Sequence, residues 1–292
     1  MSLARRCPLC DAPRARPVWQ EQRLRYVRCS SCGTVFSDVD AASYAAAQRN
    51  AWHEAELSGE AESFYGVARE LPRRRLLERF RPSGAGRLLD VGCGLGYFVA
   101  DAGAAGWDAY GCDTSEHWTR HAAALIGAPQ RIACSGPRAA LFGGDFDLIT
   151  VWDVLEHIHD PLPFLRGIAD LLGPRGRVFI RTPNVAWVYP TYALRRHLLR
   201  SDVALGPLNH VVYYSSATLR VALHAAGLRA AAGMVLPPPQ VGIANRRPQD
   251  AGQRSATTRL KNLHAAGADL IAGASRGRLA LGADLDIVAV RA

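Results

Sequence analysis

A glycine-rich turn between an apolar strand and a helix constrains the fold of this chain more than any other feature. An apolar stretch that contains Asp90 runs into Gly-Cys-Gly-Leu-Gly at 92–96, and further apolar residues follow. Glycines at such a turn let a ligand lie against bare backbone, and the helix start offers free N–H groups. A dinucleotide-binding turn needs a glycine where this chain has Tyr97. The pattern therefore predicts a ligand-binding turn in which Asp90 can meet a cationic group.

Strand and helix patterns alternate from Arg87 onward, which predicts a parallel sheet with right-handed crossovers. The predicted strands are Arg87–Val91, Asp108–Cys112, Arg131–Ala133, Phe146–Val151, Arg177–Arg181, Leu228–Leu236 and Ala283–Arg291. The predicted helices are Tyr97–Ala105, one from Thr114 or Ser115 to Gly127, Pro161–Leu172, Tyr192–Leu199, one from Ser215 or Ser216 to Gly227, and Thr258–Ala274. We expect an α/β fold with a Rossmann-like, seven-stranded and mostly parallel sheet.

Two Cys-x-x-Cys pairs near the start of the chain have the spacing of a zinc ribbon. Cys7 and Cys10 are separated from Cys29 and Cys32 by 18 residues, and Gly33 follows the second pair. Four thiolates on two knuckles complete a tetrahedron and leave no open position, so the zinc is expected to be structural. Its binding free energy, roughly 10–16 kcal/mol for such sites, would fold a module too small to fold alone. A redox dithiol is the alternative.

Composition limits the classes of partner and of cell compartment. The chain has 292 residues and a net charge of +9, carried almost entirely by dispersed arginines, so a nucleic-acid partner is not expected. No apolar run is long enough to span a membrane, and the N-terminus has no apolar signal segment. Seven cysteines without such a segment do not indicate a disulfide framework. We expect a cytoplasmic protein.

The sequence divides into three predicted parts. Residues 1–40 form the zinc ribbon, 41–85 a helical cap, and 86–292 the α/β domain, which carries insertions at 185–210 and 237–283. The aromatic residues of the cap can form either a lid over a pocket or ordinary core; they are Trp52, Phe64 and Tyr65.

Acidic and aromatic residues follow two of the predicted strands. Asp113 ends the second strand, 23 residues after Asp90, a position from which nucleotide folds reach ribose hydroxyls. Trp152 and Asp153 follow the fourth strand. Ligands of such sheets bind at the carboxyl ends of the strands. We therefore expect these side chains to border the binding cleft.

Taken together, these motifs resemble the class I S-adenosylmethionine-dependent methyltransferases. The resemblance rests on Leu-Leu-Asp-Val-Gly-Cys-Gly-x-Gly-Tyr-Phe from 88, Gly-Cys-Asp-x-Ser from 111, and Phe-Asp-Leu-Ile-Thr-Val-Trp-Asp-Val-Leu-Glu-His-Ile-His-Asp-Pro from 146. It covers about residues 86–236 and is nearest to the ubiquinone- and menaquinone-biosynthesis-like branch. A zinc ribbon ahead of such a domain is similar to methyltransferases of secondary-metabolite and cell-surface sugar pathways.

The resemblance implies S-adenosylmethionine as cofactor and assigns residues to it. Asp90 and the turn would approach its methionine part, Asp113 its ribose, and Trp152 with Asp153 its sulfonium. The position after the third strand, where an acid often contacts adenine in the family, is Cys134-Ser135. The full set of expected cofactor-binding residues is Asp90, Gly92, Cys93, Gly94, Gly96, Tyr97, Asp113, Thr114, Trp152 and Asp153.

Methyl transfer to a hydroxyl benefits from a general base. His210 is the first candidate because an imidazole titrates near neutral pH, and it precedes the aromatic-Ser start of a helix. In the sugar C-methylating relatives such a histidine faces substrate, but Pro207 and Asn209 depart from their pattern. His157 and His159 are the next candidates. Asp153 is a weaker one, because a carboxylate near the sulfonium would more simply stabilise the cofactor. A second metal held by His157, His159 and Asp160 is the alternative to simple helix packing.

Three functions remain open from the sequence. The first is methyl transfer from S-adenosylmethionine to a small-molecule acceptor, most simply a phenolic or sugar hydroxyl in a specialised-metabolite or glycan pathway. The second is C- or N-methylation of a deoxysugar nucleotide. The third is a non-catalytic scaffold whose zinc ribbon docks a protein partner. The intact glycine turn with Asp90 and Asp113 favours an enzyme.

Overall fold

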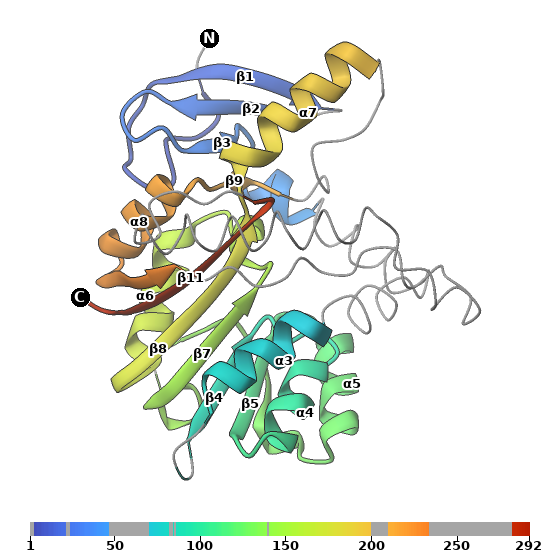
Figure 1. Cartoon of the computed structure of the whole chain (residues 1–292). Helices are drawn as coiled ribbons and strands as arrows, with labels where there is room; N and C mark the ends of the chain where they lie inside the picture. The colour runs from blue at the N-terminus through green and yellow to red at the C-terminus, as the bar shows by residue number, and fades with distance from the viewer. Residues whose placement is uncertain are drawn as a thin grey trace, which may run out of the picture.

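The computed structural model describes residues 3–21, 24–46, 70–81, 84, 86–138, 140–199, 210–233 and 282–292. Within these ranges the chain forms two sheets, one near each end of the molecule (Figure 1). A four-stranded sheet contains the cysteine-rich N-terminal segment. A seven-stranded sheet carries helices on its faces and contains the predicted glycine turn.

The seven-stranded sheet has the order β10-β11-β8-β7-β4-β5-β6. Its strands are β4 (Arg87–Val91), β5 (Asp108–Asp113), β6 (Ile132–Cys134), β7 (Phe146–Trp152), β8 (Leu172–Pro183), β10 (Leu228–Gly233) and β11 (Asp284–Arg291). β6, β5, β4, β7 and β8 are parallel, whereas β11 pairs antiparallel with both β8 and β10. The predicted Rossmann-like, seven-stranded and mostly parallel sheet is confirmed.

Four helices of the α/β part begin and end close to the predicted residues: α4 (Tyr97–Ala104), α5 (Glu116–Ile126), α6 (Pro161–Leu171) and α8 (Ser216–Ala225). The other two helices in the described ranges are α7 (Val185–Leu199), which begins earlier than predicted, and α3 (Glu70–Arg79), which precedes this part of the chain. The Ser115 side chain accepts the Trp118 N–H at the start of α5, and Gly127 ends that helix with φ +68°. Ser215 caps α8 by a reciprocal pair of hydrogen bonds with Thr218. These caps satisfy backbone groups that a helix end leaves unpaired.

The N-terminal sheet takes its fourth strand from the other end of the chain. It has the order β1-β2-β3-β9, with β1 (Ala15–Glu21), β2 (Leu24–Cys29) and β3 (Val35–Ser37) from the ribbon and β9 (Val212–Tyr213) from the segment before α8. Val35 pairs with Tyr213 and Phe36 with Val212. The ribbon and the α/β part, which the sequence divides at residue 40, therefore share one sheet. The domain boundaries remain a prediction.

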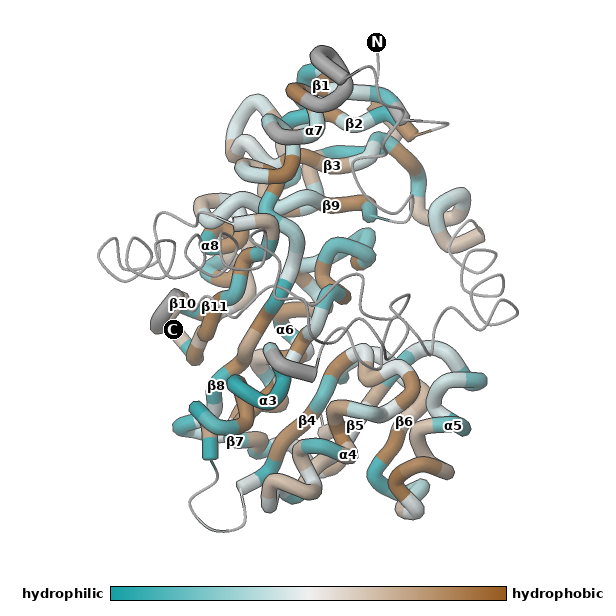
Figure 2. Tube along the Cα trace, turned by 45° about the vertical axis from the view of Figure 1, so that its right-hand side comes forward, coloured by the Kyte–Doolittle hydropathy of each residue, from teal (hydrophilic) through white to brown (hydrophobic). Residues whose placement is uncertain are grey.

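One hydrophobic core joins the two sheets. Hydrophobic residues run along β4, inside the seven-stranded sheet, and along its edge strand β6 (Figure 2). A single cluster of buried side chains extends from Val27 and Phe36 of the ribbon to Ile149 of β7 and Leu219 of α8. Because the ribbon buries its apolar face against the α/β part, it gains stability from that contact as well as from its own fold.

Three elements differ from the sequence-based prediction. Strand β8 begins at Leu172, five residues before the predicted Arg177, because Leu172 pairs with Phe146 of β7. The helix predicted at Tyr192–Leu199 begins earlier, at Val185, because the Asn184 side chain accepts the Ala186 N–H and so caps the first turn. Pro190 lies inside this helix. Strand β9 was not predicted, since two residues carry no periodicity. The predicted helix Thr258–Ala274, the cap aromatic residues and nearly all of the 237–283 insertion lie outside the described residues.

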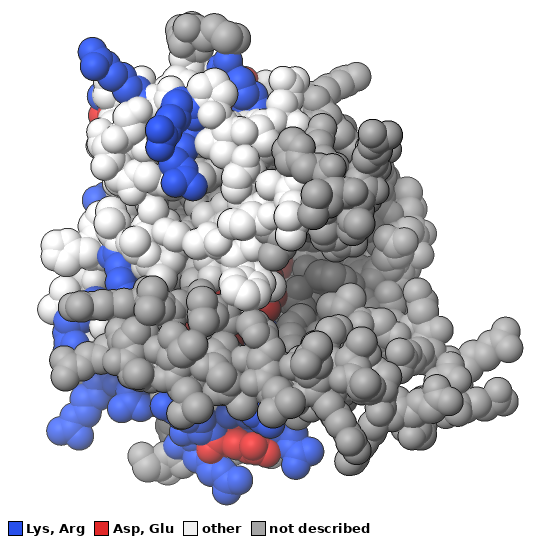
Figure 3. Space-filling model, turned by 45° about the horizontal axis from the view of Figure 1, so that its top comes forward, with Lys and Arg blue, Asp and Glu red and all other residues white. Residues whose placement is uncertain are grey.

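No helix among the described residues is long and apolar enough to cross a membrane. Arginines occur at both the upper and the lower end of the face drawn in Figure 3.

Candidate functional site

The glycine turn connects β4 to α4 in a backbone conformation that L-residues rarely adopt. Gly92, Gly94 and Gly96 have φ of +76°, +52° and +84°. A Cβ on Gly92 would lie 2.3 Å from a methyl carbon of Val154, and one on Gly96 would lie 2.7 Å from the Cβ of Ala122. The turn therefore requires glycine for its φ values and for close packing, and it leaves bare backbone at the carboxyl end of β4.

Two acids flank this turn, the buried Asp90 and the half-buried Asp113. Asp90 accepts a hydrogen bond from the Thr150 hydroxyl at 2.7 Å and is 3% exposed. Asp113, at the end of β5, accepts the Gly94 N–H at 3.0 Å and the Ser115 N–H at 2.9 Å. Burial raises the pKa of the Asp113 carboxyl, and the N–H donors only partly offset this effect. Asp113 thus links the turn to the next strand, and a ligand hydroxyl bound there would meet a desolvated carboxylate.

The other expected cofactor-binding residues surround the same strand ends. The buried Cys93 thiol lies against Gly111 of β5, where a Cβ would be 2.8 Å from its sulfur. The Tyr97 ring lies edge-on to His121, and the carbonyl of Thr114 accepts the Cys134 thiol at 3.8 Å. The structure therefore brings these residues together, while their contacts with a cofactor remain predictions.

Trp152 and Asp153 follow β7 in different environments. The Trp152 indole is 4% exposed and packs between the rings of Phe98 and Phe179, at 5.4 and 4.7 Å between centroids. Asp153 has φ +52°, and its N–H donates to the Arg181 carbonyl at 3.0 Å. The indole thus belongs to the core beneath the strand ends. The left-handed backbone of Asp153 marks the abrupt end of the strand.

Beyond β7, a short 3-10 helix (Leu155–His157) meets His210, which lies two residues before β9. Together they form an acid–histidine cluster, defined as Glu156, His157 and His210. Each residue offers one ligand atom, and these atoms all lie within 4.8 Å of one another. The rings of His157 and His210 are edge-on with centroids 4.7 Å apart, and Nε2 of His210 is 3.8 Å from Oε1 of Glu156. The Thr182 hydroxyl donates to the second oxygen of Glu156 at 2.9 Å.

The cluster contains a neutral, buried imidazole. Burial lowers the pKa of His210 well below its usual 6.5, and the nearby His157 lowers it further. His210 is 6% exposed, and its Nδ1 has no hydrogen-bond partner within the described residues. A neutral imidazole beside a carboxylate can accept a proton from a hydroxyl, and the same donor atoms suit a divalent cation.

Two of the predicted candidates for the base, His210 and His157, thus occupy one place, and Asp153 is not part of this cluster. His157 and His210 meet, whereas Nε2 of His159 points away and lies 3.0 Å from the Val39 carbonyl oxygen. A metal held by His157, His159 and Asp160 is not among the candidate ligand groups in the described ranges. Glu156 was not selected as a site residue from the sequence, although it directly precedes His157.

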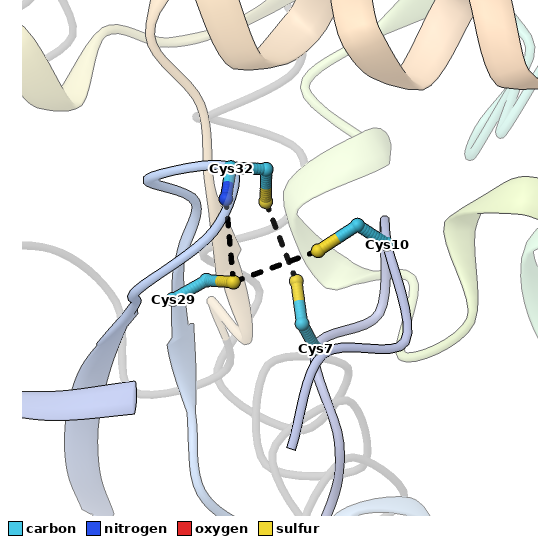
Figure 4. Close-up of side chains that lie close together, drawn as sticks. All are labelled: Cys7, Cys10, Cys29 and Cys32. Atoms are coloured by element: carbon cyan, nitrogen blue, oxygen red, sulfur yellow. Dashed lines mark hydrogen bonds between the residues drawn. The ribbon is translucent and has the colours of Figure 1, made fainter. Parts of the chain in front are cut away.

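The four ribbon cysteines converge as predicted (Figure 4). Their sulfurs lie within 4.8 Å of one another, with Cys7 and Cys32 at 3.5 Å and Cys10 and Cys29 at 3.5 Å. Zn–S bonds of about 2.3 Å in a tetrahedron place sulfurs about 3.8 Å apart, so the cluster fits zinc.

Electrostatics at this cluster also favour a thiolate ligand. Burial alone would raise the pKa of the Cys29 thiol, but the N–H groups of Cys32 and Ser31 point at its sulfur and lower that pKa to about 7. Thiolates are the form that binds zinc. Cys7 is buried and its pKa is raised, so a cation at the centre would be needed to hold it deprotonated.

Known proteins similar to this chain point to one family. The sequence profile of the methyltransferase-domain family matches residues 62–232, more than half of the chain. Ubiquinone biosynthesis O-methyltransferase from Aromatoleum aromaticum is 36% identical over 103 residues, which are 34% of this chain and 44% of that protein. The enzyme of the same name from Caulobacter vibrioides is 34% identical over 124 residues, 38% and 49% of the two chains. The chain thus spans less than half the length of these curated relatives.

Solved structures share the fold at low sequence identity. The 1,6-didemethyltoxoflavin-N1-methyltransferase of Burkholderia thailandensis, solved with 1,6-didemethyltoxoflavin and S-adenosylhomocysteine, has a TM-score of 0.53 and 18% identity, and covers 95% of this chain and 99% of its own. A chain of the complex that contains the Haloferax volcanii Trm112 methyltransferase activator has a TM-score of 0.54 and 16% identity, covering 82% and 96%. With the glycine turn, the strand order and the matched profile, the chain belongs to the methyltransferase-domain family, as the sequence motifs had indicated.

Proposed function

We propose that this protein transfers a methyl group from S-adenosylmethionine to a hydroxyl oxygen of a small molecule. The observation that carries the proposal is the alignment of two half-sites at one sheet edge. β4, β5 and β7 are parallel, with Val91 in register with both Cys112 and Val151. The glycine turn and Asp113 therefore lie at the same sheet edge as the acid–histidine cluster. The turn with Asp113 suits a nucleoside, and the cluster supplies a proton acceptor.

The residues of the first half-site fit S-adenosylmethionine. The bare backbone of Gly92–Gly96 lets a bulky ligand approach the start of α4, and Asp113 can accept hydrogen bonds from two ribose hydroxyls. Asp90 supports the turn from below through Thr150. When bound, the cofactor supplies a methyl group on a positively charged sulfur.

The residues of the second half-site fit an acceptor hydroxyl. Neutral His210 can take the hydroxyl proton as the oxygen attacks, and Glu156 at 3.8 Å stabilises the imidazolium that forms. His157 packs edge-on against His210, with ring centroids 4.7 Å apart. Orientation of the two reactants supplies most of the rate, since intramolecular reactions reach effective molarities of about 10⁵–10⁸ M.

A second role for the acid–histidine cluster is cation binding, which the 4.8 Å spacing of its ligand atoms favours. A divalent cation there would lower the pKa of a bound hydroxyl in place of a base. Titration of the zinc-loaded protein with Mn²⁺, followed by electron paramagnetic resonance, separates the two roles. One bound Mn²⁺ per chain that is lost in Glu156→Gln supports the cation, and absence of binding supports the base.

The function is tested with S-adenosyl-[methyl-¹³C]methionine and two acceptor probes. 3,4-Dihydroxybenzoate offers phenolic hydroxyls, and a thymidine-diphosphate deoxysugar offers carbon, nitrogen and sugar-hydroxyl positions. Mass and the carbon chemical shift of the labelled methyl identify the atom that receives it. Label on oxygen supports the proposal, whereas label on carbon or nitrogen replaces it with the sugar-nucleotide alternative. A folded protein that does not bind S-adenosylhomocysteine would instead be a scaffold.

We also propose that zinc occupies the four-cysteine cluster in a structural role, because the sulfur spacing leaves no position for a fifth ligand from the acceptor. Zinc content measured by mass spectrometry of the metal tests this, with one zinc per chain expected.

A further inference from the structure

Three donors from the first 44 residues reach the main chain that carries the histidines. The Tyr26 hydroxyl donates to the His210 carbonyl at 3.1 Å, and the Tyr44 hydroxyl donates to the His157 carbonyl at 2.7 Å. The guanidinium of Arg5 donates to the His159 carbonyl, two residues beyond His157, at 2.6 Å. The N-terminal region therefore holds the backbone on both sides of the acid–histidine cluster.

The main chain makes the same connection. Ser37 N–H donates to the Val211 carbonyl at 2.9 Å on the ribbon side, and Val211 N–H donates to the Glu156 carbonyl at 2.8 Å on the other side. Residue 211 thus bridges ribbon and cluster directly. Since β9 is hydrogen-bonded to β3, a displacement of the ribbon sheet would be transmitted through Val211 to His210, which lies two residues before β9.

Tyr26 is fixed in a dense aromatic cluster. It is 1% exposed, stacks on Trp19 at 4.6 Å and meets Tyr213 edge-on at 5.5 Å. Trp19 in turn stacks on Tyr189 of α7 at 5.0 Å. Aromatic contacts of this kind leave the Tyr26 hydroxyl little freedom, so its bond to the His210 carbonyl is a rigid one.

No side-chain hydrogen bond within the described residues fixes the imidazole of His210. Its Nδ1 has no hydrogen-bond partner in the described part of the chain, and its Nε2 lies 3.8 Å from Glu156, beyond hydrogen-bond distance. The ring position therefore depends on the backbone at 210 and on packing against neighbouring rings.

We propose that the N-terminal region, which is the zinc ribbon together with Tyr44 just beyond it, is a positioning element of the acid–histidine cluster, with Tyr26 and Tyr44 as its positioning residues. The proposal rests on the proposed function for the role of the histidines. Folding of the ribbon around zinc fixes the positions of the His157 and His210 carbonyls. The backbone at these carbonyls in turn fixes the positions of the two imidazoles. Small displacements of a catalytic group reduce rate strongly, because orientation supplies much of the rate.

Two conservative variants test the positioning residues. Tyr26→Phe and Tyr44→Phe each remove one hydroxyl and keep the ring. Tyr189→Phe is the matched control, because its hydroxyl lies in the same aromatic cluster and donates to the Val18 carbonyl at 3.5 Å, away from the histidines. ¹⁵N-histidine spectra, assigned with His157→Gln and His210→Gln, report the imidazoles without any acceptor.

Tyr26→Phe is expected to shift the His210 resonances and Tyr44→Phe those of His157, while Tyr189→Phe leaves both unchanged. With 3,4-dihydroxybenzoate as probe, kcat should fall about tenfold in each test variant, the amount that one net hydrogen bond can supply. The KM for S-adenosylmethionine should stay within about twofold, because Tyr26 and Tyr44 bond to the histidine side of the site. Unmoved imidazole resonances in both test variants would overturn the proposal.

The zinc connection is tested by Cys10→Ser against Cys134→Ser. Both cysteines are exposed, but only Cys10 belongs to the four-cysteine cluster. Cys10→Ser is expected to lose zinc and to shift the His157 and His210 resonances while S-adenosylhomocysteine still binds. Zinc loss with unchanged histidine resonances contradicts the proposal. Absence of S-adenosylhomocysteine binding in the unmodified protein would instead contradict the proposed function, so the two failures are distinguishable.

Discussion

The ring of His157 lies edge-on to the ring of His210, with centroids 4.7 Å apart, although one residue follows β7 and the other precedes β9. This contact joins two candidates for the general base into one cluster. It also means that neither imidazole can be protonated without raising the cost of protonating the other. Burial is the larger cause of the low pKa of His210, and the nearby His157 is the second cause.

His210→Gln should lower kcat by about 10²- to 10⁴-fold, the usual contribution of a general base, because glutamine keeps the volume but cannot accept the proton. His157→Gln should lower it less. Turnover of the 3,4-dihydroxybenzoate probe and calorimetry with S-adenosylhomocysteine measure the two halves of the site. His224→Gln, on the exposed last turn of α8, is the control. Full turnover in His210→Gln would remove this residue from the mechanism.

On acidification, cofactor affinity should begin to weaken at a higher pH than the pKa of an ordinary carboxyl would predict. Burial raises the pKa of Asp113 above 3.8, so its carboxylate is protonated at a higher pH and then accepts fewer ribose hydrogen bonds. The dissociation constant for S-adenosylhomocysteine should therefore rise as the pH is lowered from neutrality, before the pH at which an ordinary carboxyl titrates.

Asp113→Asn is the control for this pH dependence, since its amide oxygen can still accept the Gly94 N–H. The variant should bind weakly, with no dependence on pH over the same interval. Calorimetric titration at several pH values makes the measurement, with circular dichroism to confirm that the fold persists. An affinity that rises on acidification would contradict the ribose assignment.

The sequence predicted local structure better than long-range contacts. Ser115, Gly127 and Ser215 were identified as helix boundaries because capping depends on residues a few positions apart. The four-cysteine cluster was predictable because the Cys-x-x-Cys spacing already fixes each knuckle. β9 was missed because it forms by pairing with β3, far away in the chain.

The same distinction applies to the candidate site. Asp90 and Asp113 were placed correctly at the ends of β4 and β5 because strand order follows from the alternating pattern. The contacts of Tyr26 and Tyr44 with the histidine carbonyls depend on how the ribbon docks, and no periodicity in their segments encodes that docking.

Gly96→Ala should destabilise the turn and abolish cofactor binding. A Cβ at φ +84° is strained and would lie 2.9 Å from the Ala122 backbone, which cannot move without displacing α5. We expect a loss of at least about 2 kcal/mol in the free energy of unfolding. Gly103→Ala is the control, because it lies in α4 with no heavy atom within 4 Å of its added Cβ. That variant should be neutral or more stable by up to about 1 kcal/mol in urea unfolding.

Removing the charge of one partner in the buried ion pair of Arg181 and Asp286 should strongly lower the free energy of unfolding. Arg181 donates to both Asp286 oxygens at 2.7 and 2.8 Å, and the side chains are 2% and 3% exposed. Burial alone would lower the pKa of Arg181, but attraction to Asp286 outweighs it and raises that pKa. Asp286→Asn leaves the guanidinium charged and without its counter-charge, so we expect a loss of about 3–5 kcal/mol in unfolding free energy.

The effect of Asp286→Asn should extend to the site, because the Arg181 carbonyl accepts the Asp153 N–H and its guanidinium lies 5.4 Å from the Trp152 ring centroid. Glu78→Gln is the matched control, since it breaks the exposed pair between Arg74 and Glu78, which is worth about 0.5 kcal/mol or less. Urea unfolding at neutral pH measures both variants. Equal stability of the two would mean that water reaches Arg181 once its partner is lost. A large loss confined to Asp286→Asn would identify this pair as the support beneath the carboxyl ends of β7 and β8.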